Sequence, residues 1–168
     1  DLGGFAFTDV DQPCENSFAD VEGNRYITCI NADFSDIHPE TVIVTPRGNW
    51  KGKTKGGLIL SKNQGKKFER IQMPYGISDE IDEALRFIEN PNVNSGWVAM
   101  SPDTVHIVWS IADMVDLPIS RLIVSHDSGK SFSKCHIYNA QGEELIKGKV
   151  KVFSDRVDST LFYAFGEQ

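Results

Sequence analysis

The sequence lacks any apolar run long enough to cross a bilayer, which takes about 20 consecutive apolar residues. It also has no basic segment followed by an apolar one near its first residue, Asp1. A secretory signal peptide has that pattern. We therefore expect no membrane contact. If the protein is exported, we expect the signal to have been removed or to lie upstream.

Positive charge is scarce too. Seventeen Lys and Arg residues stand against 24 Asp and Glu residues, so the formal net charge is −7. Nucleic-acid binders usually carry a basic stripe. The only basic cluster is interrupted by glycine and polar residues, which is typical of a solvated hairpin edge: Lys51, Lys53, Lys55, Lys62, Lys66 and Lys67. Nucleic acid is therefore not an expected partner, whereas a neutral glycan suits an acidic chain.

Cysteine is rare as well. The three cysteines, Cys14, Cys29 and Cys135, contain no C-x-x-C pair, and the histidines show no ligand spacing, so we expect no metal. An odd cysteine count does not indicate a disulfide framework. We favour buried free thiols, with one bridge from Cys14 to Cys29 left open. The glycine-rich stretch 52–57 lacks the G-K-[ST] ending of a phosphate-binding loop, and we expect no cofactor.

The chain is rich in short apolar runs bounded by turn-forming residues, a pattern that predicts an all-β fold. The predicted strands are Gly4–Thr8, Tyr26–Asn31, Thr41–Thr45, Gly57–Ser61, Lys67–Ile71, Trp97–Ser101, Val105–Ser110, Arg121–Ser125, Ser131–His136, Lys149–Phe153 and Thr160–Phe165.

One stretch, Ser78–Glu89, has helical periodicity. Ile81, Leu85 and Ile88 share one face, Ser78 suits the N-cap, and acidic residues fill the first turn. We therefore predict one short helix inserted between two β units.

An internal repeat is the most informative feature. The pattern S-x-[DN]-x-G-x-x-F occurs twice, each time after an apolar strand. The first copy comprises Ser61, Asn63, Gly65 and Phe68, and the second Ser125, Asp127, Gly129 and Phe132. The acid or amide can accept backbone hydrogen bonds within a hairpin turn, and the glycine can adopt positive φ. The pattern resembles the Asp-box, which joins the third and fourth strands of a blade in sialidase-like β-propellers.

The repeat predicts four-stranded antiparallel blades. One blade spans roughly 26–71, a second 97–136, and the start of a third 149–165, while Gly4–Thr8 would be the last strand of a preceding blade. Propellers close with about four to eight blades. We therefore expect a partial propeller across 1–168, with the remaining blades in the same protein or in another chain.

Three segments add a more specific resemblance. The D-L-G-G-F stretch at 1–5, the G-W-V-A-M-S stretch at 96–101 with I-V-W-S at 107–110, and the S-D-R-V stretch at 154–157 with F-Y-A-F at 162–165 are similar to motifs of glycoside hydrolase family 74. A further stretch, 30–34 with 38–42, is loosely similar to the family's first-strand segment. The resemblance implies an early part of the second of two facing seven-bladed propellers.

The family resemblance also implies a reaction. Its members invert the anomeric carbon as they hydrolyse the β-1,4-glucan backbone of xyloglucan, with one catalytic Asp from each propeller. The D-[IL]-G-G-F motif places the second-propeller Asp at Asp1, although an Asp at a strand start can equally be a turn or cap residue. The partner carboxylate would lie in the other propeller. The resemblance also implies a secreted, cell-surface or periplasmic protein.

Two aromatic residues in predicted connections could stack on a sugar: Trp50 in the 46–56 connection and Tyr75 in M-P-Y-G. Each could instead fold back onto its own loop. Trp97 and Trp109 have apolar neighbours and are expected in the core. The alternative function is a non-catalytic Asp-box propeller that binds a glycan or a protein.

Overall fold

The fold is described from a computed structural model, covering residues 4–7, 9–14, 16–49, 51, 53–112, 121–139, 141–144 and 149–167. Two predicted site residues, Asp1 and Trp50, lie outside these ranges. Within them, no helix has the length and apolar content needed to span a membrane.

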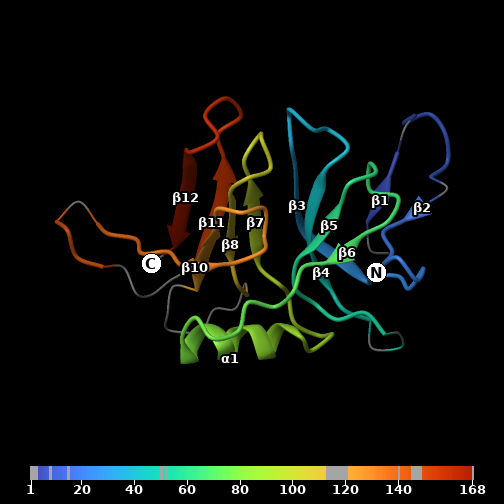
Figure 1. Ribbon diagram of the computed structural model, residues 1–168. Coiled ribbons are helices and arrows are strands. Elements are labelled where there is room, and N and C mark those ends of the chain that lie inside the picture. Colours follow the sequence, from blue (N-terminus) through green and yellow to red (C-terminus); the bar gives the residue numbers. More distant parts are fainter. Residues whose placement is uncertain are drawn as a thin grey trace.

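The described chain forms two four-stranded antiparallel sheets, in which each strand pairs with the next along the chain (Figure 1). The first sheet contains β3 (Thr28–Phe34), β4 (Val42–Arg47), β5 (Ile59–Ser61) and β6 (Glu69–Arg70). The second contains β7 (Trp97–Met100), β8 (Ile107–Ser110), β9 (Leu122–Ser125) and β10 (Ser133–Lys134). A third, two-stranded sheet pairs β11 (Lys149–Ser154) with β12 (Phe162–Glu167).

The sheets are arranged as successive propeller blades, because β7, the first strand of the second sheet, contacts β3 and β11, the first strands of the other two. In Figure 1 the β3–β4, β7–β8 and β11–β12 hairpins point to the same, upper end of the molecule. The predicted fold class, antiparallel four-stranded blades with one short helix, is confirmed. The blade limits 26–71, 97–136 and 149–165 stay predictions, since a blade includes connections as well as strands.

The N-terminal segment contains a short strand where Gly4–Thr8 was predicted, and its place as the last strand of a preceding blade stays a prediction. β1 (Phe5–Ala6) pairs with β2 (Asn16–Ser17), a strand that the sequence did not reveal. The following residues run beside β6, where the Phe68 N–H donates to the Ala19 carbonyl at 3.0 Å. The ring of Phe18 packs on that of Phe68 at 4.7 Å between centroids. The segment therefore covers apolar surface of the first blade itself.

The predicted helix is present as α1 (Asp79–Ile88). The Ser78 hydroxyl accepts a hydrogen bond from the Ile81 N–H at 3.4 Å and so caps the first turn. Its apolar stripe is buried. Figure 1 shows α1 across the end of the blades opposite to the three hairpins.

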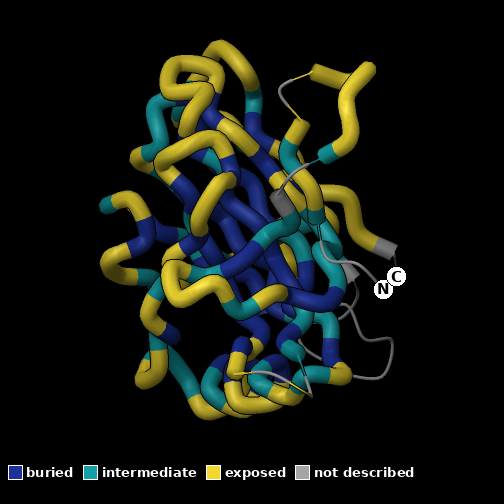
Figure 2. Tube along the Cα trace, turned by 90° about the vertical axis from the view of Figure 1, so that its right-hand side faces the viewer, coloured by how far each residue is buried: buried dark blue, intermediate teal, exposed yellow. Residues whose placement is uncertain are grey.

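The largest apolar cluster lies between the first two blades and beneath α1. It joins Ile43 of the first blade, Met100 and Trp109 of the second, and Leu85 of α1, all fully buried. Trp109 also donates its indole N–H to the Ser95 carbonyl at 2.7 Å. Figure 2 shows buried stretches, in dark blue, through the middle of the molecule and exposed ones, in yellow, around them. As predicted, Trp109 is a core residue, whereas Trp97 is only half-buried.

Candidate functional site

The two repeat turns share one hydrogen-bonding scheme. In the first, the Ser61 hydroxyl donates to the Asn63 side-chain oxygen at 2.9 Å and accepts from the Gly65 N–H at 2.9 Å. In the second, Ser125 makes the same two contacts with Asp127 and Gly129, both at 2.8 Å. The glycines have φ values of +76° and +84°, a conformation that a β-carbon would strain.

The second repeat turn holds its acid more tightly than the first holds its amide. Ser131 donates to Asp127 from its hydroxyl at 2.6 Å and from its N–H at 2.9 Å. These bonds, led by that of the Ser131 hydroxyl, lower the pKa of Asp127 to about 2. Both repeats therefore supply ordered turns rather than a reactive carboxyl group. Phe68 is fully buried, and Phe132 packs edge-on against Trp109.

A buried carboxylate joins all three blades. Asp33 on β3 is 6% exposed and accepts from the Met100 N–H of β7 at 2.8 Å and the Ser154 hydroxyl of β11 at 3.2 Å. The Arg156 guanidinium, just after β11, donates to the same carboxylate at 2.7 Å. Asn31, on the same side of β3, accepts from the Val98 N–H at 2.8 Å. Side chains of β3 thus satisfy edge N–H groups of the next blade.

At the opposite end of the blades, Glu89 ties the β4–β5 connection to α1. Its carboxylate accepts from Lys55 at 3.3 Å and from Arg70 at 3.1 Å. Burial opposes its ionisation, but the hydrogen bonds from Arg70 and Lys55 outweigh burial and lower the pKa of Glu89. Arg70 also donates to the Gly56 carbonyl at 2.8 Å. The connection that carries Trp50 in the sequence is therefore fastened to the end of α1.

Tyr75 precedes α1 at this same end of the molecule and is 45% exposed. The turn behind it is fixed by a 2.8 Å hydrogen bond from the Gly76 N–H to Asp82. The Arg86 guanidinium carbon lies 5.8 Å from the Tyr75 ring centroid, a cation–π arrangement. Tyr75 is thus a positioned, accessible aromatic residue, as a sugar platform requires. Its predicted companions Asp1 and Trp50 lie outside the described residues.

The one glycine of the D-L-G-G-F segment within the described residues has a packing role. A β-carbon on Gly4 would lie 2.4 Å from the ring of Phe18. The Gly4 carbonyl also accepts from the Phe18 N–H at 2.7 Å. The absence of a side chain therefore lets the backbone at Gly4 lie directly against Phe18, whose ring packs on Phe68 of the first blade.

Sequence reasoning missed the Asp33 network, although both of its charged ends lie in the stretches that carry the family resemblance. The signal was an acid just after the predicted strand Tyr26–Asn31 and an arginine just after the predicted strand Lys149–Phe153. Among the residues with described positions, no group of three or more His, Cys, Asp or Glu side chains could hold a metal ion. Cys29 and Cys135 are free thiols, so a Cys14–Cys29 bridge is not formed, and both are half-buried rather than fully buried as expected.

Comparison with solved structures finds a likeness in fold. No family model matches the chain, and no curated protein does. The crystal structure of a family 74 xyloglucanase from Xanthomonas campestris is similar in fold, with a TM-score of 0.56 and 16% sequence identity over 88% of this chain. The chain spans 16% of the length of that enzyme. At this identity the likeness shows the fold alone, which is consistent with β-propeller blades.

Proposed function

We propose that this chain is part of the second propeller of an inverting glycoside hydrolase of family 74, acting on the β-1,4-glucan backbone of xyloglucan or a related polysaccharide. The observation that carries the proposal is the likeness in fold to a xyloglucanase over 88% of the chain. The D-L-G-G-F segment at 1–5, which resembles the catalytic motif of that family, also supports the proposal. The parent protein would be secreted, periplasmic or attached to the cell surface.

In this proposal, Asp1 supplies one of the two carboxyl groups that inversion requires. The two groups stand about 6.5–9.5 Å apart, which leaves room for the attacking water between one of them and the sugar. Trp50 and Tyr75 would provide aromatic platforms. The tie from Glu89 to Lys55 and Arg70 supports the role of Tyr75, because it fixes Lys55 and Arg70 to the end of α1, the helix that follows the Tyr75 turn.

The second carboxyl group would come from the other propeller. An inverting enzyme needs a general acid whose pKa is raised. Every carboxyl group with a clearly shifted pKa among the described residues has it lowered instead: Glu80, Glu89, Asp103, Asp127, Asp155 and Asp158. This pattern fits a chain that contributes only one half of a catalytic pair.

Further blades are the expected partners of the third sheet. Phe153 on β11 faces Tyr163 across the pair and Lys151 faces Phe165, so these side chains share one face. Phe153, Tyr163 and Phe165 are 44%, 45% and 65% exposed. The opposite face, which includes Val152, packs against the second blade. An exposed apolar face of this kind suits another blade, in the same protein or in another chain.

The test measures release of reducing sugar from xyloglucan by the full-length protein that contains this chain. Asp1→Asn should reduce the rate by several orders of magnitude, because it removes a group that acts in proton transfer or water activation. Asp9→Asn is the matched control, since Asp9 is an exposed turn acid in the same segment whose carboxylate accepts from the Asp11 N–H. Equal activity of Asp1→Asn and wild type would refute the catalytic assignment.

The second candidate is a non-catalytic propeller that binds a glycan or a protein. The lowered carboxyl pKa values are expected equally of a non-catalytic propeller and of a chain that supplies one half of a catalytic pair, so they support both functions to the same extent. Binding of xyloglucan by the full-length protein without any hydrolysis would establish this second function in place of the first.

A further inference from the structure

A groove runs along the outer strand of the first blade. One cavity of about 290 Å³ lies between the turn at 20–22, residues 53–55 of the β4–β5 connection, and residues 68–70. A second, of about 350 Å³, continues past Val21 and Glu69 toward Lys62 and Lys67. Together these two cavities are called the β6 groove below. Their volumes lie at the lower end of the range for ligand pockets, about 300–1,000 Å³.

Tyr26 lines the first cavity and is only 4% exposed. Its ring packs in the blade core with Val44, Ile59 and Phe68. No residue with a described position forms a hydrogen bond with its hydroxyl group. The hydroxyl oxygen is not one of the fully enclosed polar atoms, although the ring is buried, so it is accessible from the cavity. The hydroxyl is therefore a polar group that an occupant of the cavity could satisfy.

The Tyr26 hydroxyl is suited to donate a hydrogen bond. Burial first, and then the negative charge of Asp20, raises its pKa to about 12. It therefore stays protonated at neutral pH. As a phenol it can also accept a hydrogen bond, so it matches a ligand hydroxyl in either role.

Two further side chains of the first cavity are available to a ligand. Lys53 and Glu69 are exposed, and neither forms an ion pair or a side-chain hydrogen bond within the described part of the chain. By contrast, Lys55 and Arg70 are engaged by Glu89, and Asp20 accepts from the N–H groups of Glu22 and Asn24. Among the described residues, the cavity is thus lined by positioned side chains and also presents two available groups, the ammonium donor of Lys53 and the carboxylate acceptor of Glu69.

The charges of the first cavity balance. Its cations are Lys53, Lys55 and Arg70, and its acids are Asp20, Glu22 and Glu69. An ion of either sign would therefore meet like charges along with opposite ones. A polyhydroxylated neutral ligand can donate to the carboxylates and accept from Lys53 and Tyr26. The exposed side chain of Val21, between the two cavities, adds an apolar contact for a sugar ring.

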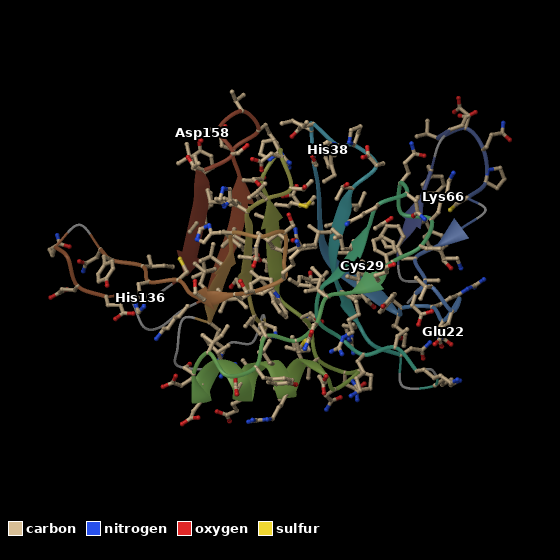
Figure 3. All side chains as sticks on the ribbon, in the orientation of Figure 1. Glu22, Cys29, His38, Lys66, His136 and Asp158 are labelled. Carbon is tan, nitrogen blue, oxygen red and sulfur yellow. The ribbon has the colours of Figure 1, made fainter. Side chains whose placement is uncertain are left out.

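We propose that the β6 groove binds a neutral oligosaccharide segment, a glycan contact additional to Tyr75 and the predicted catalytic Asp1. This inference rests on the proposed function, which supplies a β-glucan as the polymer that reaches the protein. Figure 3 shows the region of the groove, with Glu22 and Lys66 labelled on the side of the molecule that carries β1 and β2.

The test measures the affinity of the full-length protein for cellohexaose by calorimetry, in an Asp1→Asn background. Tyr26→Phe removes one hydroxyl group and leaves the packed ring in place. It should weaken binding about two- to ten-fold, the loss of one hydrogen bond. The double variant Lys53→Gln with Glu69→Gln should weaken it at least as much. Tyr138→Phe is the matched control, because Tyr138 is 58% exposed and lies outside the groove, and it should change nothing.

Salt provides a second readout. Binding of a neutral ligand should be nearly independent of ionic strength, whereas a charged ligand would lose affinity as salt is added. Unchanged affinity in Tyr26→Phe and in the double variant would overturn the groove site, and so would a steep loss of affinity with salt.

The two proposals fail separately. If Asp1→Asn abolishes hydrolysis while the groove variants bind normally, the hydrolase stands and the groove site is wrong. If the groove variants lose affinity while Asp1→Asn hydrolyses xyloglucan at the wild-type rate, the groove site stands and the catalytic assignment is wrong.

Discussion

Replacing Asp33 should destabilise the chain more than replacing any other acid whose position is described, because its carboxylate joins the three blades. Asp33→Ala leaves the Met100 N–H without its 2.8 Å acceptor, and Met100 is fully buried. An unsatisfied buried donor costs about 1–3 kcal/mol. The bond to Arg156 adds about 1 kcal/mol, the value for an exposed pair, since the arginine side chain is 46% exposed.

The expected loss is therefore about 2–4 kcal/mol of the free energy of unfolding. For a chain of this size, that corresponds to a melting temperature lower by about 5–15 °C. Asp33→Asn should lose less, because the amide oxygen can still accept from the Met100 N–H.

The measurement is urea unfolding of the full chain followed by circular dichroism. Asp36→Ala is the control, because Asp36 also faces Arg156, at 3.5 Å, but is exposed and accepts no buried N–H. It should change the free energy of unfolding by less than about 0.5 kcal/mol. If Asp33→Ala matched Asp36→Ala, the idea that the carboxylate joins the blades would be refuted.

Three further outcomes are expected. A β-carbon on Gly96 would lie 1.9 Å from the Ser110 carbonyl oxygen, so Gly96→Ala should cost more than the roughly 1–2 kcal/mol of positive φ alone. Gly142→Ala, at φ +81° with open space around it, should cost no more than that. Equal losses in urea unfolding would show that Gly96 is not sterically confined. The Asp127 carboxyl group should titrate near pH 2 in a ¹³C NMR experiment. Because folding lowers its pKa, its stabilising effect should be complete above about pH 4 and lost as the pH falls toward 2. A titration midpoint near pH 4 would show that the turn does not hold the acid. Burial raises the pKa of Cys29 to about 12, so iodoacetamide at pH 8 should label it far more slowly in the folded chain than in urea, and equal rates would exclude a buried thiol.

Local features of the fold could be predicted from the sequence. The repeat turns depend on a serine, an acid or amide, and a glycine within five positions, and the structure shows the same bonds in both copies. The N-cap of α1 is equally local: Ser78 and the apolar stripe were visible in the sequence, and the helix begins directly after Ser78.

Contacts between distant segments could not be predicted. Asp33 and Arg156 are 123 residues apart, and a single sequence gives no reason to pair them. β2 has only two residues and no apolar alternation, so its pairing with β1 depends on the surface of the first blade. The accessible Tyr26 hydroxyl, which has no hydrogen-bond partner among the described residues, also becomes visible only once the blade core and residues 53–55 are placed around it.

The stereochemistry of the first product tests the proposed reaction most directly. Proton NMR of xyloglucan treated with the full-length protein should show α-anomeric reducing ends before mutarotation mixes the two forms, because inversion of a β-linkage yields the α-anomer. The same spectra with Asp1→Asn should show no new reducing ends. Initial appearance of the β-anomer, or no cleavage by the wild-type protein, would contradict the account.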